Sequence, residues 1–380
     1  MGEQVLSDVA RAAQLREGPE GVRQLLCAVH RHGPLPLAQL ARQLRLPVPV
    51  VAAVRRELEK RDLLRREGGV ALSGRGARLI GHDLGVRTAA AFGCRHCGGT
   101  RVEVPPSLAP VAATLEQHLR GRPSPDLALD QSHGTPQTAL RRALYVHDRA
   151  AVEGRRVLLL GDDDLASVAL ALLLRELGAA AAGITVLDTD PRVLGYIAEV
   201  ARCEGLAITC RQHDLCRPLP SGHAGAFDTF LTDPPYTRAG ARLFVSRGVA
   251  ALRPGPGGQG FLCFAHKTAD VMVQVLADLA AMGLQTDEII PGFNDYEGAA
   301  VLAHCSQMIH LITTTHTRPA VSGPCEAPIY TRSEATVRRR RCRQCGRRVA
   351  VGPGAPFANA EALRERGCPQ CGGRRFEYSR

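Results

Sequence analysis

Residues 155–178, RRVLLLGDDDLASVALALLLRELG, hold a strand pattern, an acidic turn and a helix pattern in direct succession. The short apolar run Val157–Leu160 is typical of a strand that is buried on both faces. The longer apolar run after Leu165 is typical of a helix, and Gly178 marks its end. A strand, a tight turn and a helix in this order form the repeating unit of a doubly wound α/β sheet.

The same alternation continues along the chain to about residue 316. Further strand patterns lie at 183–188, 206–214, 226–236, 258–266, 286–293 and 307–315, and helix patterns lie at 191–205, 237–255 and 268–283. Buried strands that alternate with helices indicate a mostly parallel sheet. We therefore predict a Rossmann-like, doubly wound α/β catalytic domain over residues 150–335.

The N-terminal residues 1–85 have the pattern of a winged helix. Three helix patterns follow one another, and a hairpin with a Gly68-Gly69 turn comes after them. The third helix pattern carries Arg55, Arg56, Lys60 and Arg61, which is compatible with DNA binding. We favour a dimerisation or docking module with a solvated basic face, since a fold does not fix a function.

Two cysteine-containing regions flank the predicted catalytic domain. Residues 86–149 are predicted to be a linker region, in which Cys94 and Cys97 have the spacing of half a zinc knuckle. This pair could bind metal with another pair or across a dimer, or remain as thiols. Residues 336–380 form an Arg-rich tail with two further Cys-x-x-Cys pairs, 22 residues apart; they are Cys342, Cys345, Cys368 and Cys371. Four thiolates at this spacing predict a structural zinc ribbon with no open metal position.

The composition places the chain among globular proteins. Of the 380 residues 45% are hydrophobic and 22% are charged, and no stretch of eighteen apolar residues occurs. The N-terminus has no basic start followed by an apolar run, so we expect no signal peptide, no membrane partner and a cytoplasmic location. An odd number of cysteines, thirteen, fits reduced thiols and metal ligands better than disulfides.

The net charge of +11 is unevenly distributed. Residues 336–380 carry +9 and residues 1–85 carry +5, whereas residues 86–335 carry −3. Nucleic acid is therefore a possible partner of the two ends, but the central body does not favour it.

The turn after the first strand of the predicted sheet contains Gly161, Asp162, Asp163 and Asp164. Ligands of α/β sheets bind at the carboxyl ends of the strands, and this turn is the usual first contact. Nucleotide-binding turns use glycines so that backbone amides reach a phosphate, whereas three carboxylates would repel one. The turn therefore predicts a positively charged ligand.

Acidic residues also follow the second and third strands. Asp188 and Asp190 stand where an acidic residue commonly binds the ribose of an adenosine cofactor. Asp190 could instead cap the helix that begins at Pro191. Asp214 is either a partner of an adenine amino group or a simple turn residue.

The fourth strand ends in Asp233-Pro234-Pro235-Tyr236. The prolines fix the backbone, so their carbonyl oxygens and the carboxylate can converge on one amine, while the tyrosine supplies a ring and a hydroxyl. Such a site orients a nitrogen lone pair toward an electrophilic carbon. The stretch 293–298 could add acidic groups or could be an ordinary loop.

These motifs, VLLLGDDDLASVAL, ITVLDTDP and FLTDPPY in this order and spacing, resemble those of the branched-chain polyamine synthases, the N(4)-bis(aminopropyl)spermidine synthases. The resemblance covers about residues 20–320. It implies an aminopropyltransferase that uses decarboxylated S-adenosylmethionine as co-substrate and the internal secondary amine of spermidine as acceptor. It also implies active-site acids at Asp162, Asp163 and Asp164, and an amine site at Asp233 and Tyr236.

The chemistry of the residues agrees with this reading, because both the donor and the polyamine are cations. The acceptor nitrogen must lose a proton, and Asp233 is the residue that we expect to bind and activate it. The main alternative is an amino-methyltransferase that acts on nucleic acid, since such enzymes use a DPPY turn; three aspartates would, however, oppose the carboxylate of intact S-adenosylmethionine. A non-enzymatic transcription factor would leave the acidic turns unexplained. A homodimer is the expected assembly.

Overall fold

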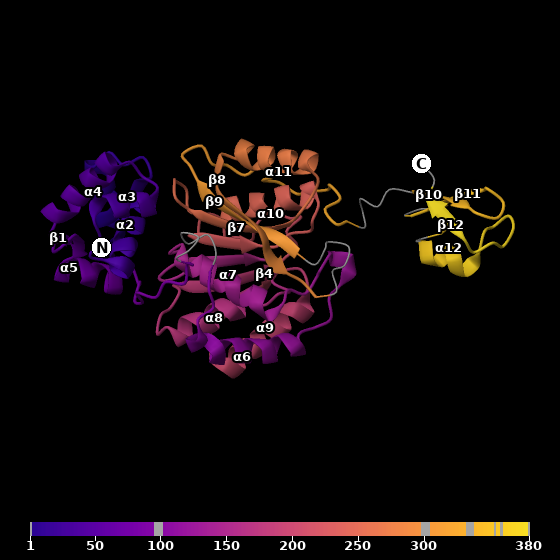
Figure 1. Ribbon diagram of the computed structural model, residues 1–380, viewed down its shortest axis with the longest axis horizontal. Helices are drawn as coiled ribbons and strands as arrows, with labels where there is room; N and C mark the ends of the chain where they lie inside the picture. The colour runs from indigo at the N-terminus through magenta and orange to yellow at the C-terminus, as the bar shows by residue number, and fades with distance from the viewer. Residues whose placement is uncertain are drawn as a thin grey trace.

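The computed structural model describes residues 2–94, 102–297, 305–331, 338–352, 355–357 and 360–378. An N-terminal helical unit precedes a central α/β domain, and a small β unit follows it at the C-terminal end (Figure 1). Within these ranges no helix has both the length and the apolar character that a membrane span requires. Cys97, the second cysteine of the predicted half knuckle, lies outside the described residues.

The central domain contains a seven-stranded sheet in the order β5-β4-β3-β6-β7-β9-β8. The first five of these strands are parallel to one another, and β9 runs antiparallel to both β7 and β8. The strands are β3 (Arg156–Leu160), β4 (Gly183–Asp188), β5 (Ile208–Gln212), β6 (Thr229–Thr232), β7 (Gln259–Ala265), β8 (Leu284–Asp295) and β9 (Cys305–Thr313). The predicted mostly parallel α/β sheet is confirmed.

Alternate residues of β3 face two separate hydrophobic layers. Val157 and Leu159 pack with the helices α6 (Ala109–Gly121), α7 (Pro136–Asp148), α8 (Ala166–Glu176) and α9 (Pro191–Glu204). Leu158 and Leu160 pack with α10 (Arg238–Ala251) and α11 (Ala269–Ala281) on the other face (Figure 1). All four side chains are buried, as a strand between two helical layers requires.

Residues 86–149 do not form a linker between domains in their described part. The helices α6 and α7 pack against each other and against α8, and they bury Leu115, Leu119, Leu140 and Leu144 in the core of the central domain. The predicted boundary at residue 150 therefore cuts through a packed layer. The error arose because the Pro-rich segments between these helices resemble a linker, although each helix has an apolar face.

The N-terminal unit contains three helices and a hairpin in the predicted order. After α1 (Gly2–Ala12) come α2 (Gly18–His32), α3 (Leu37–Leu44), α4 (Val48–Lys60), the antiparallel hairpin β1 (Leu64–Arg66) and β2 (Val70–Leu72), α5 (Gly74–Arg78) and a π-helical turn at Leu79–Asp83. Leu35 forms a β-bridge with Val70. The winged-helix assignment of this unit stays a prediction.

Most basic side chains of α4 are already paired with acids of the same helix. Lys60 and Arg61 contact Glu57 at 2.6 and 2.7 Å, and Arg55 lies 3.6 Å from Glu59. These intrahelical pairs reduce the positive charge that the helix could offer to a polyanion.

Buried polar contacts join the N-terminal unit to the central domain. Arg23 of α2 donates to the backbone oxygens of Leu84 and Glu153, at 3.3 and 2.7 Å. The Glu153 carboxylate is also buried, and it lies 3.0 Å from Nε2 of His147 and 3.6 Å from Arg31 of α2. Charged groups from both units thus share one buried network.

The C-terminal unit is a three-stranded antiparallel sheet with one short helix. Its strands are β10 (Arg338–Cys342), β11 (Arg348–Val351) and β12 (Phe376–Tyr378), in the order β11-β10-β12, and its helix is α12 (Ala360–Arg366). Val349, Val351, Phe357 and Leu363 form a small separate core.

Candidate functional site

A pocket opens at the carboxyl ends of β3, β4 and β6, where the strand order of the sheet reverses. The space that it outlines, including solvent at its mouth, is about 560 Å³. Five aspartates line it: Asp130, Asp163, Asp188, Asp214 and Asp233. No lysine or arginine is found among the described residues of its wall. The pocket therefore suits a cationic ligand, as the sequence predicted.

Only one of the three aspartates in the acidic turn lines this pocket. Asp162 accepts hydrogen bonds from the backbone amides of Ala166 and Ser167, at 2.7 and 3.2 Å, and so satisfies the first turn of α8. Asp164 is buried and accepts from Arg142 at 2.7 Å and from the amide of Gly134. Asp162 and Asp164 therefore each have structural contacts, and their catalytic roles stay predictions.

Carboxyl groups are crowded together where the turn meets the pocket. Burial raises the pKa of Asp163 well above its usual value, and the charges of Asp164, Asp233 and Asp188 raise it further. Burial also raises the pKa of Asp162 to about 7. Gly161, with φ +74°, adopts a backbone conformation that favours glycine, and it lines the pocket directly. A positive ligand would relieve this concentration of carboxylates.

The predicted adenosine-binding acids separate into two groups. Asp188 and Asp214 line the pocket, and Asp188 accepts from the amides of Asp162 and Asp190 at 3.0 and 2.8 Å. Asp190 does not line it. Its side chain accepts from the amide of Arg192 at 2.9 Å at the start of α9, so it is the helix cap that the sequence also allowed. Asp190 therefore has a structural contact as the N-cap of α9, and its role as a cofactor ligand stays a prediction.

Asp233 has two oxygens in different environments. Oδ2 accepts from Arg142 and from the hydroxyl of Tyr296, both at 2.7 Å. Oδ1 is buried and has no hydrogen-bond partner in the described part of the chain. Burial raises the pKa of Asp233, while the charge of Arg142 lowers it. One oxygen of the carboxylate is therefore fixed in place and the other lacks a donor.

The rest of the DPPY turn has a less direct place at the pocket. Pro235 lines the pocket, whereas Pro234 is buried and does not line it. The Tyr236 hydroxyl donates to the hydroxyl of Tyr296 at 2.7 Å, so it supports the contact of Tyr296 with Asp233. Tyr236 does not line the pocket, and its predicted role at the reacting amine is thus indirect in this geometry.

Sequence reasoning missed Arg142 and Tyr296, which surround Asp233. Arg142 belongs to α7, in the region predicted as a linker, and Tyr296 follows β8 directly. The stretch 293–298 was expected either to add acids to the pocket or to be a loop. Instead Asp295 forms an ion pair with Arg141, whose partly exposed side chain lies outside the pocket, while Tyr296 turns to the site.

Two segments far apart in sequence supply the outer wall. Leu129, Asp130 and Gln131 come from the loop before α7, and Ile329 and Tyr330 come from the segment after β9. Asp130 accepts from the amide of Thr331 at 2.6 Å, which ties the two segments together. No local motif marks these residues, so their position depends on the tertiary fold.

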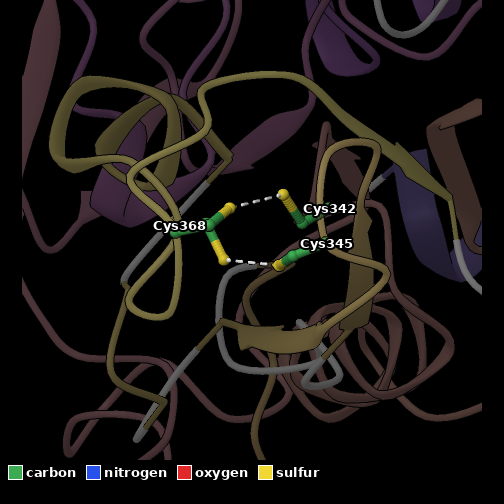
Figure 2. Close-up of side chains that lie close together, drawn as sticks. Cys342, Cys345 and Cys368 are labelled. Carbon is green, nitrogen blue, oxygen red and sulfur yellow. Dashed lines mark hydrogen bonds between the residues drawn. The ribbon is translucent and has the colours of Figure 1, made fainter.

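The four cysteines of the C-terminal unit form a second candidate site. Their sulfur atoms lie within 4.8 Å of one another, and the pairs Cys342–Cys371 and Cys345–Cys368 are each 3.6 Å apart. Figure 2 shows Cys342, Cys345 and Cys368 turned toward one another. Four thiolates bound to zinc at about 2.3 Å would have their sulfurs about 3.8 Å apart. The cluster therefore fits a tetrahedral metal ion with no open position.

Comparisons with known proteins agree with the resemblance found in the sequence. A sequence model of the branched-chain polyamine synthase A C-terminal domain matches residues 111–333. The N(4)-bis(aminopropyl)spermidine synthase of Thermococcus kodakarensis is 34% identical over 257 residues, which cover 66% of this chain and 70% of that protein. An uncharacterized protein of Methanocaldococcus jannaschii is 32% identical over 375 residues, which cover 98% of this chain and 92% of that protein.

A solved structure is similar over most of the chain. It is the branched-chain polyamine synthase of Thermus thermophilus in complex with N4-aminopropylspermidine and 5'-methylthioadenosine. The similarity has a TM-score of 0.55 and 26% identity, and it covers 87% of this chain and 96% of that one.

Proposed function

Because this chain belongs to the branched-chain polyamine synthase family, we propose that it transfers aminopropyl groups from decarboxylated S-adenosylmethionine to the internal secondary amine of spermidine. As a member of this family it is an aminopropyltransferase that makes branched polyamines. The donor, the acceptor and the residues that hold them are the proposal.

The observation that carries the proposal is the unpartnered oxygen of Asp233. A buried carboxylate oxygen without a donor is costly, so we infer that a donor reaches it in the working enzyme. An N–H of the acceptor amine supplies that donor. The carboxylate of Asp233 then binds the amine and takes up the proton that the nitrogen loses.

The acidic wall of the pocket supports cations as both substrates. Decarboxylated S-adenosylmethionine carries a sulfonium and an ammonium, and spermidine is a polycation. Asp163 belongs to the acidic turn and interacts electrostatically with Asp164, Asp188 and Asp233, so a positive charge bound beside it would be stabilised by several carboxylates. Asp188 and Asp214 stand at the ends of β4 and β5, and we assign the nucleoside part of the donor to them.

The transfer is a substitution at the carbon next to sulfur. The nitrogen lone pair forms the new C–N bond, and the C–S bond breaks with its electron pair returning to sulfur. The products are neutral methylthioadenosine and an alkylated ammonium, whose proton passes to Asp233 or to water. A second transfer to the same nitrogen would give a quaternary ammonium and release no proton. Much of the rate then comes from alignment of the two reactants.

We propose a structural role for the C-terminal cluster. Zinc bound by Cys342, Cys345, Cys368 and Cys371 would be fully coordinated by the protein, so it would stabilise the small C-terminal unit. No step of the transfer involves this cluster.

A product assay tests the proposed reaction. The purified protein is incubated with spermidine and decarboxylated S-adenosylmethionine, and in parallel with intact S-adenosylmethionine and DNA or RNA. The expected result by mass spectrometry is a polyamine heavier by one or two aminopropyl units, with methylthioadenosine released. Methylated nucleic acid without a new polyamine would refute the proposal and favour the methyltransferase alternative.

A further inference from the structure

Arg142 connects the two acidic motifs of the pocket through one guanidinium group. Its side chain is 2% exposed. Nη1 donates to Asp164 of the acidic turn at 2.7 Å, and Nη2 donates to Asp233 of the DPPY turn at 2.7 Å. These aspartates follow β3 and β6, neighbouring strands on either side of the point where the strand order reverses.

We propose that Arg142 is a positioning residue for aminopropyl transfer: it holds Asp233 by Oδ2 and thereby keeps Oδ1 available to the acceptor amine. The inference rests on the proposed function, which assigns the amine to Asp233. Arg142 does not line the main pocket, although it lines a smaller cavity that shares Asp163 and Asp233 with it. Both of its Nη atoms donate to carboxylates, so its action on the amine passes through Asp233.

The third edge of the guanidinium is also fixed. Nε donates to Oδ1 of Asn294 at 2.7 Å, and Asn294 in turn donates to the hydroxyl oxygen of Ser306 at 2.9 Å. Nη2 additionally donates to the hydroxyl of Tyr296 at 2.9 Å. Because a planar guanidinium presents its donors in a fixed arrangement, these contacts set the orientation of the Asp233 carboxylate. A lysine could supply the charge but not this arrangement.

The positive charge of Arg142 stabilises the carboxylates that lie close together around Asp233. Asp163, Asp164 and Asp233 act on one another electrostatically, and Arg142 is the cation that contacts two of them. The other titratable groups that face Asp233 are Tyr236, Tyr296 and Cys263, and burial raises the pKa of each. Loss of Arg142 would therefore raise the pKa of Asp233 and favour its protonated form, which cannot accept a proton.

The experiment compares Arg142→Gln, Arg142→Lys and the control Arg141→Gln by steady-state kinetics across pH. Arg141 is the next residue on α7, but its side chain pairs with the half-exposed Asp295 outside the pocket. For Arg142→Gln we expect kcat to fall by about 100-fold, KM to change far less, and the acid limb of the pH profile to move to higher pH. Arg142→Lys should restore the acid limb but only part of kcat, and Arg141→Gln should behave as wild type.

The outcomes separate this inference from the proposed function. Absence of product with the wild-type enzyme would refute the proposed function itself. An active wild type, together with an Arg142→Gln variant of unchanged kcat and pH profile, would overturn the role of Arg142 alone. If circular dichroism shows that Arg142→Gln is unfolded, Arg142→Lys decides the question: a lowered kcat with an unchanged acid limb supports the role, and a wild-type kcat overturns it.

Discussion

The substitution Asp233→Asn tests the core of the proposed chemistry with little change in shape. The amide oxygen of asparagine can still accept from Arg142 and Tyr296 in the place of Oδ2, and its NH₂ group then replaces the unpartnered Oδ1. Arg142 also keeps Asp164 as its counter-ion. We therefore expect the free energy of unfolding to fall by only about 1–2 kcal/mol, because no buried charge is left unpaired.

The same substitution should be severe for catalysis. It places a donor where the amine needs an acceptor, and it removes the proton acceptor. Loss of general base catalysis costs about 10²- to 10⁴-fold in rate, which corresponds to about 3–5 kcal/mol in the activation barrier. The two effects can thus be measured separately, since transfer should be nearly abolished in a protein that remains folded.

The assay follows methylthioadenosine release with time, and thermal unfolding is measured on the same samples. Asp295→Asn is the matched control, because Asp295 pairs with Arg141 outside the pocket and should leave turnover unchanged. Turnover of Asp233→Asn within about threefold of wild type, in the linear range of the assay, would show that Asp233 neither activates nor orients the amine.

Further predictions concern stability and the metal cluster. Burial raises the pKa of Asp162 to about 7, so its contribution to stability is fully present below its unfolded pKa and is lost as the pH rises toward 7. The melting temperature of Asp162→Asn should therefore fall less than that of wild type between pH 5 and pH 8. An equal fall in both proteins would count against this account. Leu173→Ala should lower the free energy of unfolding by about 2–5 kcal/mol in denaturant titrations, because Leu173 is fully buried in the core of the central domain. The same substitution at the exposed Val273 should have almost no effect. Equal effects would contradict the assigned core. Metal analysis should find about one zinc per chain, which Cys345→Ser removes, and deletion of residues 336–380 should leave aminopropyl transfer intact; a folded but inactive truncation would show that the C-terminal unit contributes to the reaction.

The sequence predicted those parts of the site that lie at the ends of strands. The apolar run Val157–Leu160 has the composition and length of a buried strand, so the position of the acidic turn after it followed directly. The DPPY turn after β6 followed in the same way. Parallel strands bring their carboxyl ends to one edge of a sheet, and the two turns were therefore expected at one pocket.

The separate contacts of the three adjacent aspartates could not be predicted from the sequence. Asp162, Asp163 and Asp164 are chemically identical and adjacent, and only the tertiary structure shows that Asp162 binds the start of α8, that Asp164 pairs with Arg142, and that Asp163 lines the pocket. Arg142 itself is 91 residues from Asp233 in sequence. Its contact depends on the packing of α7 against the sheet, and no local pattern reports such packing.

The buried network around Glu153 has a consequence for cooperativity. Its carboxylate belongs to the central domain, yet it also accepts from the amides of Arg87 and Thr88, and Arg31 of α2 lies beside it. If the N-terminal unit melted alone, this buried carboxylate would lose Arg31, while His147 beside it stayed in the packed central domain. The unfolding equilibria of the two units are thereby coupled, so the N-terminal unit contributes to the free energy of unfolding of the central domain.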